Sequence, residues 1–118
     1  MTRLLVDTSV WIDHLRRGDA ELAALLDEGM VLVHPFVIGE IACGTLHQRD
    51  VVLGHMRHLP EAPLATEAEV HHLLEGHRLG GRGLGWVDLH LLASARLAAV
   101  PLITRDRALH AVAQGVLA

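Results

Sequence analysis

The sequence predicts an α/β fold with three layers, in which a central parallel sheet of four to five short strands is flanked by helices. Short apolar runs alternate along the chain with stretches of helical periodicity. Two of these runs, 4–6 and 101–104, lead into hydroxyl and acidic residues. Strands separated by helices pair in parallel through right-handed crossovers, so the alternation indicates a parallel sheet. With 118 residues the chain can form one core, and we expect a single domain over residues 1–118.

The composition limits the classes of protein that the chain can belong to. Apolar residues make up 51% of it and charged residues 20%, which is typical of a folded domain. All ten basic residues are arginine, and the net charge is −4 at pH 7. A broad basic face for nucleic acid needs clustered Lys or Arg, so the composition argues against that class. Any contact with nucleic acid must be local or mediated by a metal ion.

The sequence predicts a cytoplasmic protein with no membrane association. No apolar run approaches the roughly 18 residues that a membrane-spanning helix needs, and the N-terminus lacks the pattern of a signal peptide. The only cysteine, Cys43, cannot form an internal disulfide, which agrees with a reducing compartment.

The first strand, 4–6, is followed by a pair of helices. Ser9 is expected to cap a helix that runs to about Arg17 and ends at Gly18. Asp19 is expected to cap a second helix that runs to about Glu28, with leucines at helical spacing. These two helices should form a hairpin.

A second strand, 31–33, leads into a helix that begins at Pro35 and runs to about Leu46. This helix contains Glu40 within an otherwise apolar and small-residue run, so we expect Glu40 to be buried or semi-buried. A buried charge without a partner costs several kcal/mol. A metal ion or an arginine should therefore lie close to it.

The middle of the chain is expected to be mostly helical. A helix over 49–58 precedes a short edge strand over 61–65. Thr66 and Glu69 match a capping box for a helix that runs to about Leu79. Four glycines in the segment 80–85 then predict a flexible loop.

The last part of the chain repeats the pattern of the first. A helix over 86–98 carries Asp88 in its first turn, and the strand 101–104 follows it. A final helix over 106–114 and a short closing strand over 116–117 complete the predicted fold.

Four acidic residues are expected to converge at one edge of the sheet. Asp7 and Asp106 each follow an apolar strand, and the carboxyl ends of parallel strands lie at the same edge. Asp88 begins a helix after the glycine loop, and Glu40 lies one turn into its helix, so both can reach that edge. Each acid has a simpler explanation: the aspartates can cap helices, and Glu40 can form a buried ion pair. The four together are harder to explain in that way.

The chemistry of the four acids favours a divalent metal ion. Carboxylates at about 4 Å repel each other by roughly 4 kcal/mol per pair at an effective dielectric constant of 20, and a hard cation relieves that repulsion. Oxygen ligands without His or Cys favour Mg²⁺ or Mn²⁺. Such an ion can polarise a phosphodiester and activate water. Ser9 and Thr104 supply hydroxyls that can orient water or phosphate.

The chain resembles PIN domains, and specifically the VapC-type toxin ribonucleases of bacterial toxin–antitoxin pairs. The resemblance covers nearly the whole chain, and the motifs are specific in their order and spacing. They are Val6-Asp7-Thr8-Ser9-Val10-Trp11-Ile12, Val37-Ile38-Gly39-Glu40-Ile41, Asp88-Leu89 with Ala93 and Ala95, and Leu102-Ile103-Thr104-Arg105-Asp106.

This resemblance implies an endoribonuclease that depends on Mg²⁺ or Mn²⁺, forms a homodimer and is inhibited by a VapB-type antitoxin protein. It implies metal-binding and catalytic roles for the four acids, and supporting roles for the two hydroxyl residues. The four acids with metal-binding and catalytic roles are Asp7, Glu40, Asp88 and Asp106. The two hydroxyl residues with supporting roles are Ser9 and Thr104. For the antitoxin we expect an apolar surface formed by the first helices.

Several other residues are weaker candidates. Arg82 in the glycine loop and Arg105 are candidates for contact with RNA or a partner, although Arg105 can instead pair with an acid at the site. Trp11 and Trp86 are expected in the core or an interface. Of the ten histidines, the pairs His55 with His58 and His72 with His77 lack the accompanying ligands of a transition-metal site, so we expect these four on the surface.

Three other functions compete with RNA cleavage. A receiver-type phosphoacceptor domain needs a lysine, and this chain has none. A PIN-like module that only binds a partner would be expected to have lost at least one of the four acids. A metal-dependent nuclease acting on DNA usually carries extra elements that grip a duplex, for which 118 residues leave little room.

Overall fold

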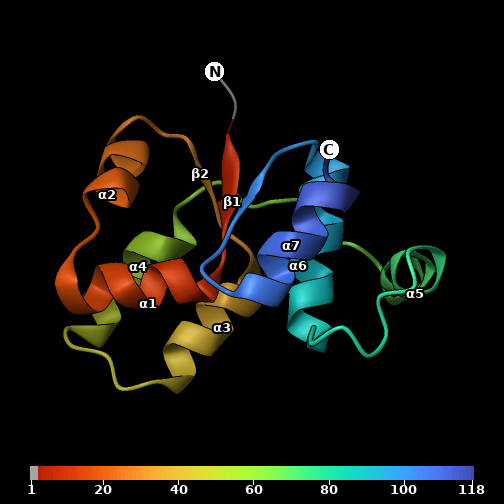
Figure 1. Ribbon diagram of the computed structural model, residues 1–118. Helices are drawn as coiled ribbons and strands as arrows, with labels where there is room; N and C mark the ends of the chain where they lie inside the picture. The colour runs from red at the N-terminus through yellow and green to blue at the C-terminus, as the bar shows by residue number, and fades with distance from the viewer. Residues whose placement is uncertain (1–2) are drawn as a thin grey trace.

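A computed structural model describes residues 3–118 and shows a parallel sheet of three strands flanked by helices (Figure 1). The strands are β1 (Leu4–Val6), β2 (Val31–Leu32) and β3 (Leu102–Ile103), in the order β2-β1-β3. Leu5 is paired with Leu32 on one side and Leu102 on the other. The prediction of a parallel sheet with flanking helices is confirmed. The prediction of four to five strands is wrong for the described residues.

Two predicted strands, 61–65 and 116–117, do not form, and the physical reason differs between them. Near 61–65 the chain makes only one parallel bridge, between Val33 and Glu61. Pro60 and Pro63 lie on either side of this bridge and have no N–H groups to extend it. At the C-terminal end, helix α7 (Arg107–Val116) takes up the first residue of the predicted strand, and the second residue, Leu117, is its C-cap. Its buried Leu109, Val112 and Ala113 follow the spacing of a helix face.

Between β1 and β2 the predicted helical hairpin is present as α1 (Thr8–Arg17) and α2 (Ala20–Asp27). Asp19 caps α2 by accepting a hydrogen bond from the Leu22 N–H, as predicted. Asp7, not Ser9, occupies the cap position of α1. Gly18, which has a φ of 78°, turns the chain between the helices.

The remaining helices agree closely with the predicted pattern. They are α3 (Pro35–Cys43), α4 (Arg49–Arg57), α5 (Glu67–Gly76) and α6 (Trp86–Ala98). Thr66 and Glu69 form the predicted capping box. No helix among residues 3–118 is long and apolar enough to cross a membrane.

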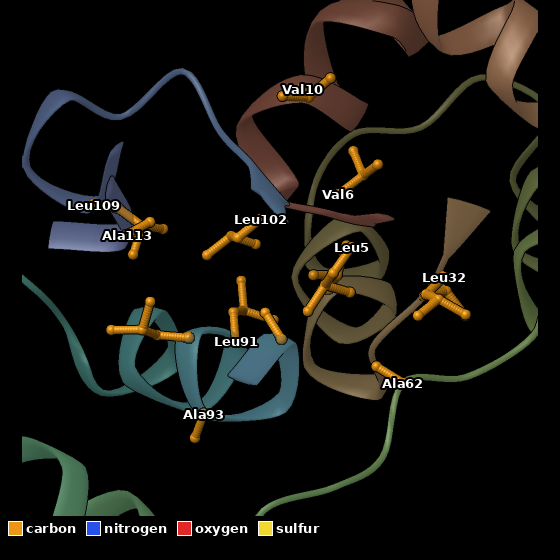
Figure 2. Packing of buried hydrophobic residues seen from close by; sticks show 14 of the residues in the cluster. Leu5, Val6, Val10, Leu32, Ala62, Leu91, Ala93, Leu102, Leu109 and Ala113 are labelled. Carbon is orange, nitrogen blue, oxygen red and sulfur yellow. The ribbon is translucent and has the colours of Figure 1, made fainter. Parts of the chain in front are cut away.

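The core lies on both faces of the short sheet (Figure 2). Successive residues of β1 point in opposite directions, so that Leu5 faces Leu91 of α6 whereas Val6 faces Val10 of α1. All four side chains are buried, and each buried aliphatic side chain contributes about 1.5–3 kcal/mol. Burial on both faces fixes the register of β1, and so the position of Asp7 directly after it.

The carboxyl edge of the sheet collects the beginnings of several helices. The chain enters α1, α3 and α7 soon after leaving β1, β2 and β3, respectively. Helix α6 leads back into β3, so its first turn lies at this edge and its last turn at the opposite one (Figure 1). This arrangement places the beginnings of four helices around the end of β1.

The first helices keep part of the predicted apolar surface. Ile12 and Leu15 of α1 and Leu25 and Leu26 of α2 pack against the core but are only partly buried. Among the described residues, the large apolar side chains with the greatest exposure lie outside α1 and α2: Phe36, Val51, Leu64, Trp86, Leu97 and Ile103. The apolar surface of the two helices is therefore small, and its use by an antitoxin stays a prediction.

His34, which follows β2, is completely buried and caps α3. Its Nδ1 accepts a hydrogen bond of 2.9 Å from the Phe36 N–H, so the proton of the neutral ring is on Nε2. Nε2 has no hydrogen-bond partner within residues 3–118. Burial, together with the charge of His90, lowers the pKa of His34 to about 4. The ring is therefore neutral at physiological pH. The four histidines predicted to lie on the surface, His55, His58, His72 and His77, are exposed.

The His34 ring should make stability depend on pH. Between pH 6.5 and about 4 the unfolded chain binds a proton that the folded protein does not, so the free energy of unfolding falls as the pH is lowered. His34→Asn keeps a capping side chain and removes this titration. From pH 7 to pH 5 we expect the variant to lose about 2 kcal/mol less than the wild type in urea denaturation. His47→Asn, at an exposed position, is the control, and an equal response of both variants would contradict this assignment.

Candidate active site

Asp7 is the buried centre of the candidate site. It follows β1 directly, its side chain is only 6% exposed, and its N–H donates to the Ile103 carbonyl of β3 at 2.9 Å. The Asp7 carbonyl begins the hydrogen bonding of α1, but the carboxylate forms no capping bond. The carboxylate is therefore not needed to start the helix, and the simpler explanation of Asp7 as a side-chain cap is excluded.

Two hydroxyl groups hold one oxygen of this carboxylate. Asp7 Oδ2 accepts hydrogen bonds from Ser9 Oγ at 2.8 Å and from Thr104 Oγ1 at 2.7 Å. These hydroxyls in turn accept the backbone N–H groups of Arg105 and Asp106, each at 3.0 Å. Ser9 and Thr104 thus fix the orientation of Asp7, while Oδ1 has no hydrogen-bond partner among the described residues. That oxygen remains available to a ligand.

Asp106 lies beside this pair, at the beginning of α7. Its Oδ1 accepts a hydrogen bond of 3.0 Å from the Leu109 N–H, so Asp106 does cap the helix. Its N–H is bonded to Thr104 Oγ1, which links it to Asp7 through a single side chain. The capping bond uses one carboxylate oxygen and leaves the other free for a second role.

Asp88 is half-buried in the first turn of α6. Its Oδ2 accepts a hydrogen bond of 2.8 Å from the Gly85 N–H. Burial raises the pKa of Asp88, and the negative charges of the other three acids, Asp7, Asp106 and Glu40, raise it further against the opposing effect of the Gly85 bond. The four predicted acids therefore act on one another electrostatically in one region of the protein.

Glu40 reaches this region from α3. Its Oε1 accepts a hydrogen bond of 2.6 Å from Thr8 Oγ1, at the beginning of α1. Glu40 is exposed, so the prediction that it is buried or semi-buried was wrong. Helix α3 turns Val37 and Ile41 toward the core, and Glu40 lies on its solvent-facing side. Thr8 was not predicted as its partner, because no local pattern links residues 32 positions apart.

The donor set fits a hard divalent cation. No three His, Cys, Asp or Glu side chains within residues 3–118 stand close enough together to ligate one ion as they are placed. Mg²⁺ nevertheless needs only one or two direct carboxylates, because it retains several of its waters and binds substrate phosphate. Carboxylate oxygens with a free lone pair at Asp7 and Asp106 match that requirement.

The two arginine candidates differ in their surroundings. Arg82 is exposed in the loop before α6. The Arg105 guanidinium pairs with Asp13 of α1 and with Asp19, the cap of α2, and neither is among the four acids of the site. Neither aspartate was predicted to take part, because only the tertiary structure brings them to Arg105.

A row of aromatic rings flanks the site on the side of α3, α5 and α6. Phe36, His90, Trp86 and His71 form successive ring contacts with centroid distances of 4.8–5.0 Å. Burial lowers the pKa of His90, although the charge of Glu67 opposes this effect. Trp86 is 42% exposed and therefore outside the core, whereas Trp11 is buried.

Comparisons with known proteins agree with this arrangement. Residues 4–115 match the family model described as the PIN domain. The chain belongs to the PIN-domain family. It is 50% identical over 109 residues to Ribonuclease VapC32 of Mycobacterium tuberculosis, from both strain CDC 1551 / Oshkosh and strain ATCC 25618 / H37Rv. Each match covers 92% of this chain and 88% of the relative. The resemblance seen in the motifs is thus confirmed.

The raised pKa of Asp88 implies that its charge destabilises the metal-free protein. The ionised form is disfavoured on folding, so the free energy of unfolding falls as the pH rises above the usual carboxyl range. Asp88→Asn keeps an acceptor for the Gly85 N–H and removes the charge. In EDTA at neutral pH we expect its melting temperature to rise by a few degrees, because the unfavourable charge is removed.

The control for this prediction is Glu75→Gln, which removes an exposed charge on α5. Its melting temperature should change by no more than about 2 °C. The gain from Asp88→Asn should shrink toward pH 4, where the wild-type carboxyl becomes protonated. A lower melting temperature for Asp88→Asn at neutral pH would contradict the electrostatic interpretation.

Proposed function

We propose that this protein is a metal-dependent endoribonuclease of the PIN-domain family, and the toxin of a type II, VapBC-like toxin–antitoxin pair. The observation that carries the proposal is the buried Asp7 carboxylate, held by two hydroxyls at the carboxyl edge of the sheet and surrounded by the charges of three further acids. The printed name of the 50% identical relatives, Ribonuclease VapC32, supports RNA as the substrate.

The acids would hold a Mg²⁺ or Mn²⁺ ion. Asp7, Asp88 and Asp106, with Glu40, form a donor set of carboxylate oxygens, which suits these two cations. When bound, the ion would polarise the phosphodiester and make a water more acidic. The proposed site thereby needs no lysine or broad basic face to engage RNA, which agrees with the net charge of −4.

The side chains of the site would orient the carboxylates and accept the proton of the attacking water. Ser9 and Thr104 hold Asp7 Oδ2, so the carboxylate cannot rotate away from the substrate. Thr8 holds Glu40 Oε1, and the other oxygen of this exposed carboxylate can accept the proton of the attacking water. Attack of that water on phosphorus breaks one phosphorus–oxygen bond of the RNA chain and leaves a phosphate end and a hydroxyl end.

The proposal extends to the partners of the protein. We expect a VapB-type antitoxin to inhibit it and the chain to form a homodimer, as in the toxins that its motifs resemble. We place its action in the cytoplasm, which the single cysteine supports. The whole of residues 1–118 would act as one PIN domain.

The first test is cleavage of a panel of labelled bacterial RNAs by the purified protein, freed of any bound partner. We expect discrete products with Mg²⁺ or Mn²⁺ and none with EDTA. Asp7→Asn should reduce the rate by about 100-fold or more, because it removes a charged group from the reaction centre. Asp50→Asn, at an exposed position on α4, is the matched control and should retain wild-type activity.

Further measurements separate the competing functions. Single-stranded DNA of the same sequences is included, and equal cleavage of DNA and RNA would contradict the assignment to RNA. Mg²⁺ or Mn²⁺ should raise the melting temperature of the wild type and have less effect on Asp7→Asn. If neither cleavage nor this shift is observed, the protein is a partner-binding module that retains only the appearance of the site.

A further inference from the structure

The connection between β3 and α7 consists of Thr104, Arg105 and Asp106, and the outer two of these residues belong to the proposed site. The side chain of the middle residue, Arg105, pairs with acids outside the proposed site. Arg105 Nε lies 2.8 Å from Asp13 Oδ2, and Arg105 Nη2 pairs with Asp19 Oδ2. One guanidinium thus joins the connection to a carboxylate of α1 and to the capping carboxylate that precedes α2.

The point to which Arg105 is attached is itself well fixed. Asp19 Oδ1 accepts from the Leu22 N–H at 3.0 Å, and the Asp19 N–H donates to His14 Nδ1 at 3.1 Å. These bonds restrain both the backbone and the side chain of Asp19 in the turn between α1 and α2. The Leu22 hydrogen bond and the Arg105 charge also lower the pKa of Asp19, so this partner stays ionised.

The backbone of Arg105 reaches the site directly. Its N–H donates to Ser9 Oγ at 3.0 Å, and Ser9 Oγ donates to Asp7 Oδ2. The preceding residue, Thr104, donates to the same Asp7 oxygen. A shift of the connection would therefore disturb both hydroxyls that orient Asp7 and would move Asp106 with them.

Little of the connection is buried: Arg105 and Asp106 are exposed and Thr104 is half-buried. A pocket of about 150 Å³ that is partly open to solvent lies against it, lined by residues of the β1 and β3 ends, α1 and α2, including Val6, Leu22 and Thr104. Few buried contacts therefore restrain the connection, and the ion pairs of Arg105 add a restraint. Arginine suits this role, because its planar guanidinium has several N–H groups and can donate to two carboxylates at once.

We propose that Arg105 is a positioning residue of the ribonuclease: by tying the β3–α7 connection to Asp13 and Asp19, it fixes the hydroxyls that orient Asp7 and the place of Asp106. This inference rests on the proposed ribonuclease activity. It assigns the guanidinium to the protein's own acids and not to RNA phosphate. Half-exposed ion pairs add little to global stability. Loss of the Arg105 side chain should therefore change the cleavage rate much more than the free energy of unfolding.

The test compares steady-state cleavage by Arg105→Gln, Arg105→Lys and Arg107→Gln. Arg105→Gln should lower kcat by about 10- to 100-fold with KM changed by less than about threefold, because a misplaced reacting group costs rate more than binding. Arg105→Lys, which can pair with only one carboxylate, should be intermediate. Arg107→Gln removes the same charge from an exposed position two residues away and should retain wild-type kinetics. A raised KM with unchanged kcat in Arg105→Gln would overturn the proposal.

A double variant tests the same idea from the opposite side. Asp13→Asn with Asp19→Asn keeps the cap of α2, since Asn caps as well as Asp, and releases Arg105 from its partners. We expect kcat to fall as in Arg105→Gln. If the released arginine instead binds RNA, KM will fall and kcat/KM will rise, and the positioning role is wrong.

Amide hydrogen exchange gives a readout that does not depend on activity. Loss of the clamp in Arg105→Gln should speed exchange at residues 105 and 106 by about 10-fold or more, while the core strands keep wild-type protection. Unchanged exchange at both amides would overturn the proposal whatever the kinetics. A wild type that cleaves no RNA would contradict the proposed function alone, because the exchange measurement still tests the clamp.

Discussion

The hydrogen bonds from Ser9 and Thr104 to Asp7 Oδ2 are the interaction on which the arrangement of the site depends. A buried carboxylate without partners would cost several kcal/mol, and two hydroxyls offset that cost while leaving the second oxygen free. One hydroxyl comes from the beginning of α1 and the other from the end of β3. The bonds therefore require β1 and β3 to be neighbours, which the Asp7 N–H confirms by donating to Ile103.

The rest of the site is a balance between repulsion and the local fields of the helices. Asp7, Asp88 and Asp106 stand at the beginnings of α1, α6 and α7, where the positive end of each helix dipole favours negative charge. Burial, with the charges of the other three acids, nevertheless raises the pKa of Asp88 despite the hydrogen bond from Gly85. The protein thus stores unfavourable electrostatic energy that a cation would relieve, at a cost to the stability of the metal-free fold.

Burial also acts on two histidines of the neighbouring segments. It lowers the pKa of His34 to about 4, and it lowers the pKa of His90 as well. The aromatic row that includes His90 meets a negative charge at one end, because Glu67 lies 3.7 Å from His71 and opposes the lowering of the His90 pKa. The guanidinium of Arg105 is neutralised by Asp13 and Asp19.

The sequence by itself determined the features that depend on neighbouring residues: helix beginnings such as the Thr66–Glu69 capping box, the apolar periodicity of α6, and acids placed directly after strands. It also predicted that Ser9 and Thr104 serve the acidic site, but by orienting water or phosphate, whereas the structure shows both hydroxyls bonded to Asp7. It could not reveal the solvent-facing position of Glu40 or the absence of further strands within residues 3–118, because burial depends on which elements pack together. Only the tertiary structure decided that Arg105 meets Asp13 and Asp19, since this contact joins segments about 90 residues apart and no local pattern encodes it.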